Sequence, residues 1–428
     1  AIGRMAKHAE ARGFGRGVVT YRLKDWLISR QRYWGTPIPV VYCEKDGMQP
    51  VPDSALPVVL PKDAPFTGEG GNPLAKVPAF VNVICPKCQG PARRETDTMD
   101  TFVDSSWYFY RYLSPRKDDG PVDVAAVRYW FPIDLYVGGI EHAILHLVYS
   151  RFWTKVMRDL GLVSFDEPVL RLFPQGMVHK DGEVMSKSKG NTVAPDDVIA
   201  SYGADTLRVY VLGEAPAEMA LEWSEERIGG SFRLVQRAWR LVDRHAAALA
   251  SSTAGQVTGD LPEAARDLRR KTHQTIQKVT ADVERIHLNT AVAAFHELVN
   301  EIHRLEAAVT SGTGIAALRE AIETLVLLMN PFAPHVCEEM WLRLGHEGGL
   351  VRHAWPVADE AAAREDSVEL AVQVNGKVRG RITVAREAGE DEIRRSALAE
   401  PRVAEEVNGK QVTKIIVVPG RLVSLVVR

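Results

Sequence analysis

Apolar residues follow a strand–helix–strand rhythm in the middle of this chain of 428 residues. Residues 133–137 form a short apolar run, residues 143–160 carry apolar positions at helical spacing, and residues 170–178 form the next run. Alternation of this kind predicts a parallel sheet, whose ligands bind at the carboxyl ends of the strands. We therefore predict an α/β domain over residues 101–222.

The apolar spacing then becomes helical over long stretches, at residues 228–249 and 264–286. Asn289 and the Asn330-Pro331 step interrupt this pattern, and we predict helix boundaries there. The composition that follows is rich in Gly, Ala and acidic residues, as in a linker. These patterns predict a helical bundle and then a linker, at residues 223–345 and 346–367.

The end of the chain returns to the spacing of β-strands. Two alternating apolar runs, residues 370–374 and 378–384, flank Asn375-Gly376-Lys377. Asn-Gly between such runs is the strongest short-range sign of a hairpin. The pattern therefore predicts a small α+β module over residues 368–428. A helix and two further strands complete it, at residues 390–398, 415–418 and 422–427.

The first hundred residues are less regular. Residues 1–40 begin with a short helical segment and run through three glycines into Val18–Tyr21, which reads as a strand. Residues 41–100 are rich in Pro and Gly and hold three of the four cysteines, which predicts an irregular insertion.

Composition narrows the class of protein. Apolar residues make up 46% and charged residues 25%, an ordinary globular balance. No apolar run reaches the roughly 18 residues of a membrane span, and no secretory leader pattern opens the chain. Few cysteines fit a reducing compartment, so we expect a cytoplasmic protein. The net charge of −2 does not decide whether the chain binds nucleic acid.

The most informative short stretch is Met185–Asn191, which packs two lysines, Lys187 and Lys189, beside two serines and Gly190. Two point charges on a glycine-hinged loop suit a polyphosphate whose charge grows in the transition state. A solvated basic loop is the alternative for such a stretch in isolation.

A second stretch, Gly138–His146, lies where a strand ends and a helix begins. Its glycines let the backbone approach a nucleoside closely, and Glu141 can accept hydrogen bonds from ribose hydroxyls. His142 and His146 share one helix face. That spacing also occurs in zinc sites, but a third ligand and a general-base Glu between them are missing. Surface or core histidines are the simpler alternative.

Two aromatic segments carry further candidates. In Thr96–Tyr108, Asp104 is a plausible N-cap, and the helix after it would present Ser105 and Tyr108 on one face. An aromatic helix packed on a sheet is the alternative. Asp25–Gly35 alternates cations with aromatic rings, which suits an exposed RNA end or else a strand at a rim.

Cys43 and Asp46, with Cys85 and Cys88, are spaced like the two knuckles of a zinc ribbon. Four cysteines would be a strong indication, but Asp46 stands in place of one. A Cys₃Asp zinc site and an empty knuckle both stay open. Cys337 is expected to pack as a small apolar residue.

Taken in order, these segments resemble the leucyl-tRNA synthetase family of class I aminoacyl-tRNA synthetases. Met185–Asn191 resembles the mobile KMSKS loop, in which Val184 replaces the first lysine, so Lys187 and Lys189 alone can serve as its catalytic cations. The resemblance implies that ATP and the adenylate are bound by Gly138, Gly139, Glu141, His142, Met185, Ser186, Lys187 and Ser188. It implies a leucine pocket made by Phe102, Ser105, Tyr108 and His146.

The same resemblance implies RNA contacts, and it implies that the helical bundle of residues 223–345 is a tRNA-binding bundle of the anticodon-binding type. Arg30 and Arg32 would guide the tRNA 3′ end, although similar stretches occur in isoleucyl and valyl enzymes. Lys377 and Arg379, in the C-terminal hairpin, would contact the tRNA body. The module that holds them carries eleven Lys and Arg against eight Asp and Glu, so an ordinary charged hairpin is the alternative.

The implied activity is the two-step charging of tRNA(Leu): leucine and ATP give leucyl-adenylate, which then acylates the tRNA 3′ end. The implied cofactors are ATP, Mg²⁺ and, at the cysteine cluster, Zn²⁺. A non-catalytic tRNA-binding protein is the competing hypothesis, and an intact adenylate pocket argues against it. Isoleucyl or valyl specificity is disfavoured by the Glu141–His146 segment.

One family component is absent. A His-x-Gly-His motif lies in the first half of the family's nucleotide fold, but none of the twelve histidines here is three residues from another. The family's editing domain is missing too, unless residues 1–17 are its trailing edge, and residues 1–40 would then lead from the editing insertion back into the catalytic domain. The chain begins with Ala1. We therefore expect the second half of a Rossmann-like catalytic domain, which needs an N-terminal half from a separate subunit or a missing segment.

Overall fold

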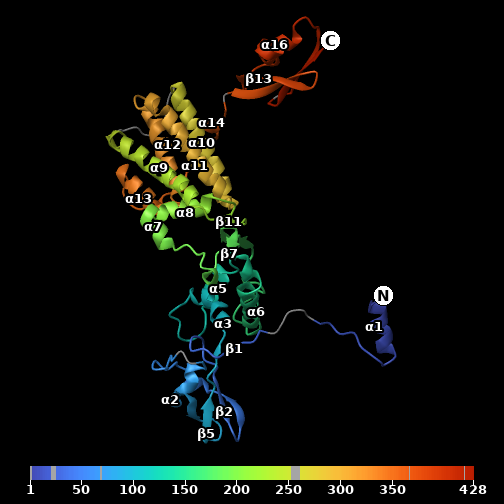
Figure 1. The fold of residues 1–428 in the computed structure, drawn as a ribbon, viewed down its shortest axis with the longest axis vertical. Helices are drawn as coiled ribbons and strands as arrows, with labels where there is room; N and C mark the ends of the chain where they lie inside the picture. The colour runs from blue at the N-terminus through green and yellow to red at the C-terminus, as the bar shows by residue number, and fades with distance from the viewer. Residues whose placement is uncertain (1, 21–25, 68–69, 252–260, 366, 419) are drawn as a thin grey trace. The chain divides into compact units, whose positions relative to one another are not determined.

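The computed structural model describes residues 2–20, 26–67, 70–251, 261–365, 367–418 and 420–428, without the side chains of residues 250, 251 and 367. The chain forms two compact units, Ala1–Gln175 and Gly176–Arg428 (Figure 1). Within the described ranges, every helix is too short or too polar to cross a membrane.

The first unit begins with the predicted short helix, α1 (Ile2–Ala11). Val18–Thr20 form no strand, because no described strand lies beside them to take their backbone hydrogen bonds. The strand predicted for Val18–Tyr21 is therefore wrong at these three residues, and Tyr21 lies outside the described residues. A two-stranded antiparallel pair follows, formed by β1 (Ser29–Arg30) and β6 (Thr98–Met99).

Residues 40–94 fold as a four-stranded antiparallel sheet of order β3-β2-β5-β4. The sequence predicted an irregular insertion here, because strands of three or four residues are too short to show a period of two. Its core contains Cys43 and Cys85. The strands are β2 (Val40–Cys43), β3 (Gly47–Pro50), β4 (Asn82–Ile84) and β5 (Pro91–Arg94). Short helical turns lie between β3 and β4: η1 (Asp53–Ala55), η2 (Pro73–Lys76) and α2 (Pro78–Val81).

Residues 101–175 show the predicted alternation of helix and parallel strand. Strand β7 (Tyr136–Gly139) pairs in parallel with β8 (Leu172–Gln175), and α6 (His146–Asp159) connects them. The connecting helix starts later than predicted, because Ile140–Ala143 form a 3₁₀ turn, η3. Three short helices precede β7: α3 (Thr101–Ser105), α4 (Tyr108–Arg111) and α5 (Val124–Trp130).

The second unit opens with a small sheet of order β10-β9-β11, in which β9 and β11 are parallel. The elements of this part are β9 (Val178–Lys180), β10 (Glu183–Val184), η4 (Lys187–Lys189), α7 (Pro195–Tyr202), α8 (Ala204–Gly213) and β11 (Leu221–Glu222).

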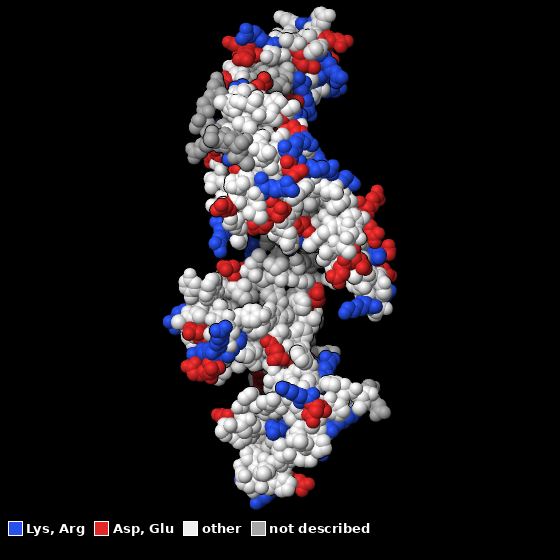
Figure 2. All heavy atoms as spheres, turned by 90° about the vertical axis from the view of Figure 1, so that its left-hand side faces the viewer, with Lys and Arg blue, Asp and Glu red and all other residues white. Residues whose placement is uncertain are grey.

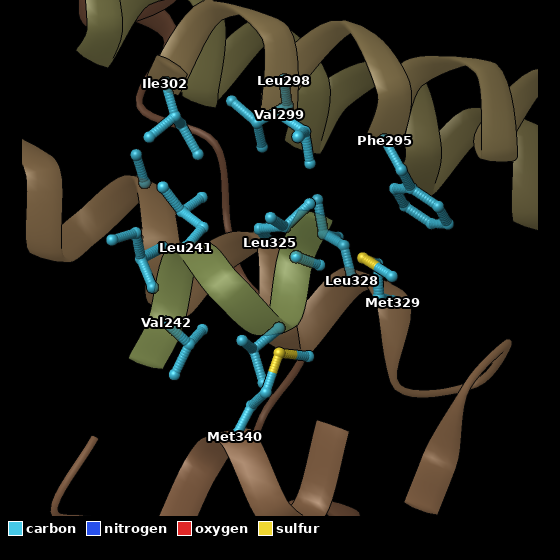
Figure 3. Packing of buried hydrophobic residues seen from close by; sticks show 14 of the residues in the cluster. Leu241, Val242, Phe295, Leu298, Val299, Ile302, Leu325, Leu328, Met329 and Met340 are labelled. Atoms are coloured by element: carbon cyan, nitrogen blue, oxygen red, sulfur yellow. The ribbon is translucent and has the colours of Figure 1, made fainter. Parts of the chain in front are cut away.

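The predicted helical bundle follows and encloses the largest apolar core of the described chain (Figure 3). Asn330 is the C-cap of a helix, as predicted, whereas Asn289 lies inside a first helical turn. The helices are α9 (Glu225–Ser251), α10 (Glu263–Glu284), α11 (Leu288–Val309), α12 (Gly314–Met329) and α13 (Pro334–Arg343).

The stretch that the sequence predicted as a linker contains η5 (Leu350–Arg352) and α14 (Glu360–Ala363). The Trp355 indole donates a hydrogen bond to Thr280 at 2.8 Å, and the Asp359 backbone N–H donates one to His273 at 3.1 Å. This stretch is therefore held against α10 over part of its length.

The C-terminal module is a four-stranded sheet of order β13-β12-β15-β14 with two helices. Asn375 and Gly376 both have positive φ, 49° and 80°, as a two-residue hairpin turn requires, so the predicted hairpin is confirmed. A short helix, α16, was not predicted. The elements are β12 (Ser367–Val374), β13 (Lys377–Ala385), α15 (Glu390–Ala399), α16 (Pro401–Val407), β14 (Val412–Val418) and β15 (Leu422–Val427).

Candidate functional site

His146 is the centre of the polar network in the first unit. Its Nε2 lies 2.6 Å from the backbone carbonyl oxygen of Ser105, and its Nδ1 lies 2.6 Å from the Tyr136 hydroxyl. Because a carbonyl oxygen can only accept, Nε2 must carry the proton, and Nδ1 of the neutral ring then accepts from Tyr136. The two contacts fix both the tautomer and the orientation of the imidazole.

The structure brings together three of the four residues predicted for the leucine pocket. The Tyr108 ring lies 6.4 Å from the His146 ring, and Ser105 contacts His146 directly. Phe102 instead packs its ring 5.0 Å from Tyr149, which stacks on Trp26 at 4.1 Å. Phe102, on α3, thus packs on a ring of α6 one turn beyond His146.

Tyr136 was missed by the sequence reasoning. It occupies the first position of β7, two residues before Gly138, where the sequence shows only an apolar run that ends in glycines. A hydroxyl-bearing ring two residues before the glycines that end the strand is the feature that could have identified it.

The helix cap beside the pocket is also shifted from its predicted place. Asp100, and not Asp104, caps α3, since its carboxylate accepts from the Phe102 N–H at 2.9 Å. Strand β6 ends at Met99, so the helix begins earlier than the sequence indicated.

A cavity of about 1130 Å³ opens beside Ser105 and Tyr108. Its other walls include Trp34, Gly35 and the apolar stretch 56–60. Gly35 has a φ of 151°, and a Cβ there would lie 2.6 Å from the Met99 carbonyl oxygen, so only glycine fits. The cavity offers a largely apolar space beside Ser105 and Tyr108, whereas His146 lies behind these two residues and is not part of its wall.

The glycine pair at the end of β7 makes room for a carboxylate. A Cβ at Gly139 would lie 2.4 Å from Glu141 Oε2, whereas at Gly138 the nearest atom would be 3.9 Å away. Glu141 therefore folds back over Gly139 with its side chain half exposed. The neighbouring His142 has a buried Nδ1 with no hydrogen-bond partner. Both side chains keep unused hydrogen-bonding capacity for a ligand.

The lysine-bearing loop belongs to the second unit and is held by its own polar groups. Ser186 caps η4, accepting from the Ser188 N–H at 3.2 Å, and the two hydroxyls lie 2.7 Å apart. Gly190 closes the turn with a φ of 69°. Asn191, which the sequence reasoning did not single out, accepts from the Ser186 N–H at 2.8 Å and donates to the Val184 carbonyl.

The two lysines of this loop differ in their surroundings. Lys189 forms an ion pair with Glu183 at 2.9 Å. The Lys187 side chain is exposed and makes no hydrogen bond or ion pair with any residue that the structure describes. Met185 continues the hairpin, donating its N–H to Val178 at 3.1 Å. Lys187 is thus the cation that is free to meet a ligand.

The two arginines predicted to guide an RNA end also differ. Arg30 forms an ion pair with Asp100 and donates to the Leu27 and Ser29 carbonyls. Arg32 is exposed, and its side chain has no partner within the described ranges. Asp25, part of the same predicted segment, lies outside the described residues.

Cys43, Asp46, Cys85 and Cys88 gather at two facing turns of the four-stranded sheet. Their ligand atoms all lie within 4.8 Å of one another. Cys43 Sγ lies 3.6 Å from Cys88 Sγ, and Asp46 Oδ2 lies 3.5 Å from Cys85 Sγ. Ligands about 2.1–2.3 Å from a tetrahedral zinc ion would be about 3.6–3.8 Å apart. The donor set therefore fits zinc in both chemistry and size.

The acid–base properties of this cluster follow from its hydrogen bonds. Backbone N–H groups of Asp46 and Lys45 lower the pKa of the Cys43 thiol. Hydrogen bonds from the Cys88 and Cys85 thiols lower the pKa of Asp46. The Cys88 thiol, which donates to that carboxylate, has its pKa raised to about 12. A bound cation would replace these protons, because the thiolate is the form that ligates metal.

In the C-terminal hairpin, Lys377 is exposed and has no side-chain partner that the structure describes, whereas Arg379 lies 3.4 Å from Glu406.

Two protein families match this chain. The family described as "tRNA synthetases class I (I, L, M and V)" matches residues 18–224. The family described as "Anticodon-binding domain of tRNA ligase" matches residues 265–393.

Similar proteins match over nearly the whole chain. A leucine–tRNA ligase of Syntrophobacter fumaroxidans is 52% identical over 97% of this chain and 50% of its own length. One of Geotalea uraniireducens is 52% identical over 99% of this chain and 51% of its own length. The chain thus spans about half the length of the curated relatives it matches.

A solved structure, the LeuRS–tRNA–LeuAMS ternary complex of Agrobacterium radiobacter, matches with a TM-score of 0.83 and 38% identity. The match covers 99% of this chain and 54% of that one. It supports the predicted fold class: a Rossmann-like catalytic part, a helical bundle and a small α+β module. Sequence, fold and relatives agree, and the chain belongs to the leucyl-tRNA synthetase family of class I synthetases.

Proposed function

We propose that this chain supplies the leucine pocket, the loop lysines and the tRNA-binding parts of a leucine–tRNA ligase. In the first step a leucine carboxylate oxygen would attack the α-phosphorus of ATP, giving leucyl-adenylate and releasing pyrophosphate. In the second, a ribose hydroxyl at the 3′ end of tRNA(Leu) would attack the adenylate carbonyl and release AMP.

The fixed His146 is the observation that carries this proposal. An oriented imidazole next to Tyr108, with a largely apolar cavity beside Tyr108 and Ser105, suits a small apolar side chain. Phe102 and Ser105 would shape the same pocket. One missing methylene is worth only about 1–3 kcal/mol in such a site, so this pocket alone would separate leucine from valine weakly.

The glycine pair is the second support, because the bare backbone at Gly138 leaves room for a nucleoside and Gly139 leaves room for the Glu141 carboxylate. Glu141 would accept hydrogen bonds from the ribose, and the unpaired Nδ1 of His142 would meet the adenylate. These roles use the polar groups that the fold leaves unsatisfied.

Lys187 would stabilise the charge that develops on the leaving pyrophosphate. Its exposed, unpaired side chain can move with the loop, and such a contact acts mainly on the transition state. Met185, Ser186 and Ser188 would hold the loop against the phosphates, and Lys189 would add a second charge after leaving Glu183. Mg²⁺, when bound to ATP, would neutralise part of the phosphate charge.

The tRNA would meet this chain at several places. Arg32, with Arg30, would guide the 3′ end, and Lys377 and Arg379 would contact the tRNA body. The exposure of Arg32 and Lys377 supports these roles. The domain boundaries predicted above, and a cytoplasmic location, stay predictions.

Zinc is the metal that we propose for the cysteine cluster. Cys43, Asp46, Cys85 and Cys88 would hold it, and its role would be to staple two hairpins whose own apolar core is small.

We propose that the activity needs residues beyond those of this chain, as in relatives of about twice its length. Exposed apolar side chains such as Ile144 and Tyr129 support this, because large exposed apolar surfaces mark contacts with other segments. Leucine-dependent pyrophosphate exchange tests it, with the chain alone and with the N-terminal half of the Syntrophobacter relative added.

Exchange should be absent with the chain alone and present with both parts. Robust exchange by the chain alone would refute the need for a second part. No exchange from the combined parts, each shown to be folded, would refute the proposed activity.

A further inference from the structure

The turn Glu95–Asp97 joins the sheet that holds the cysteine cluster to the arginine segment, residues 29–32. It follows β5 and precedes β6, which pairs with β1. Asp97 is half-buried, and its carboxylate accepts from the Ser29 hydroxyl at 2.6 Å and from the Gln31 amide at 2.5 Å. One carboxylate therefore holds two side chains of the arginine segment.

The same carboxylate is also fixed from the side of the sheet. Asn72, the N-cap of η2, donates to the other Asp97 oxygen at 3.2 Å and to the Thr96 carbonyl at 2.7 Å. Glu95 accepts from the two backbone N–H groups that follow it, at 2.7 and 2.8 Å. Its second oxygen accepts from the Tyr42 hydroxyl of β2 at 2.7 Å. The turn is thus a hydrogen-bonded junction between the sheet and the arginine segment.

The side chains that donate to Asp97 in the described part of the chain are all neutral. Figure 2, in contrast, shows Asp and Glu interspersed with Lys and Arg over most of the face in view. An ionised carboxylate accepts at both oxygens, so Asp97 can serve donors on both sides. An asparagine amide would turn its own donor toward one of these groups. The junction therefore requires an acid at this position.

The backbone of Arg32 is held as well, while its guanidinium is left free. The Arg32 carbonyl accepts from the buried Thr98 hydroxyl at 2.8 Å, and Asp97 holds the preceding residue, Gln31. The Arg32 side chain is exposed and has no partner that the structure describes. A charged side chain on a fixed backbone is preorganised to meet a ligand, because less freedom is lost on binding.

We propose that Asp97 is a positioning residue, which sets Arg32 against the 3′ end of tRNA by holding Ser29 and Gln31. Asp97 itself contacts neither the RNA nor the adenylate and acts through Arg32. A displacement of about 1 Å in such a group can cost about a hundredfold in rate. This inference rests on the proposed function, since it assumes that Arg32 guides the 3′ end.

The test compares two reactions of the chain completed with the N-terminal half of the Syntrophobacter relative. Pyrophosphate exchange needs no tRNA, whereas charging of a tRNA(Leu) transcript needs its 3′ end. Asp97→Asn should lower kcat/KM for tRNA in charging by about 10–100-fold and leave leucine-dependent pyrophosphate exchange within about twofold. Asp53→Asn is the matched control, because it removes an exposed carboxylate of η1 with no side-chain partner that the structure describes, and it should change neither reaction.

A double-mutant cycle tests whether Asp97 acts through Arg32. Arg32→Gln alone should lower charging about tenfold, as the loss of one charged contact does. Because both changes remove the same contact with RNA, Asp97→Asn/Arg32→Gln should charge no more slowly than the more severe single variant. Losses that multiply would show that the two residues act independently and would overturn the inference.

The chain alone supplies a structural readout. Amide hydrogen exchange of residues 29–32 should become faster in Asp97→Asn and stay unchanged in Asp53→Asn. Equal protection in the two variants would mean that Asp97 does not hold the segment. If Asp97→Asn fails to fold, Gln31→Met decides, since it keeps the carboxylate and should impair charging but not pyrophosphate exchange.

The outcomes separate this inference from the proposed function. If the completed, unaltered enzyme does not charge tRNA, or if Arg32→Gln charges normally, the proposed role of Arg32 fails and this inference fails with it. If Arg32→Gln is impaired but Asp97→Asn matches Asp53→Asn, only this inference is overturned. Equal loss of charging and of pyrophosphate exchange in Asp97→Asn would assign the residue to the fold of the pocket and would also overturn it.

Discussion

The bundle of α9 to α13 and the pocket-bearing residues 101–175 bury their apolar side chains to different degrees. Within the described part of residues 225–365, the large apolar side chains that stay exposed are Leu342, Val351 and Val357. Residues 101–175 expose many more, among them Tyr112, Tyr129, Trp130, Ile144, Phe152, Leu160 and Leu170.

The two regions differ because only the bundle can cover its own apolar faces. Long amphipathic helices cover one another, so the bundle makes a continuous core from its own residues (Figure 3). A two-stranded parallel sheet with short helices cannot cover its own faces. The bundle is therefore expected to be stable by itself, whereas the pocket depends on further residues to complete it.

The largest expected effect is on the bundle core. Phe295 is fully buried and packs edge-to-face on Phe332 at 5.0 Å. Phe295→Ala should lower the free energy of unfolding of the bundle by about 3–5 kcal/mol, because it removes a large ring and leaves a cavity. The matched change Phe152→Ala, at an exposed ring on α6, should cost under about 0.5 kcal/mol. Urea unfolding followed by circular dichroism measures both changes in the free energy of unfolding. Equal losses in the two variants would contradict the proposed difference between the two regions.

The cysteine cluster lies in a smaller apolar core, and the bundle core can be compared with it as well. Cys85→Ser should weaken zinc binding by at least about a hundredfold, since even outer partners of a metal are worth about 10–100-fold. Metal analysis should find one zinc in the unaltered chain and almost none in the variant, with faster proteolysis within residues 40–94. The bundle should unfold as before. Stoichiometric zinc in a Cys85/Cys88 double variant would exclude this site.

Removal of the C-terminal module tests whether the bundle is self-contained. Deletion of residues 368–428 should leave bundle unfolding and leucine activation unchanged, because the module has its own core. tRNA charging should fall about tenfold, with a reduced dependence on salt. The readouts are pyrophosphate exchange and charging by the chain completed with the relative's N-terminal half. Equal damage to both steps would mean that the module supports the fold.

The smallest effect concerns Glu167, which tethers α6. Hydrogen bonds from Arg151, at 2.6 and 2.7 Å, lower its pKa from 4.5 to about 2. A lowered folded-state pKa stabilises the fold above pH 4.5, and this contribution is lost as the pH falls toward 2. The pair is well exposed, so Glu167→Gln should cost under about 1 kcal/mol at pH 7 and nothing near pH 2. Thermal melts at both pH values check this, and a loss that persists at pH 2 would contradict it.

Much of the fold could be predicted from the sequence, because long periodic segments carry their own information. The α9 and α10 helices and the Asn375-Gly376 hairpin are of this kind. The four strands of residues 40–94 could not be predicted, since each is too short for a period and the sheet closes around a cluster of ligand side chains.

The sequence predicted several residues of the candidate site but not the partners that position them. His146, Ser105 and Tyr108 lie together, as the resemblance implied. The Tyr136 hydroxyl that fixes the imidazole comes from strand β7, whereas the other three residues lie on helices, and spacing does not encode this tertiary contact. The ion pairs that engage Arg30 and Lys189 but leave Arg32 and Lys187 free are likewise visible only in the folded chain.

The most direct test of the account is pyrophosphate exchange by a Lys187→Ala variant of the chain, completed with the N-terminal half of a relative. We expect leucine-dependent turnover to fall about 10²–10³-fold with ATP binding nearly unchanged, since the charge acts mainly in the transition state. Lys180→Ala, a nearby lysine on β9, is the control and should retain activity. Unchanged turnover with only a raised ATP requirement would contradict the catalytic role of the loop.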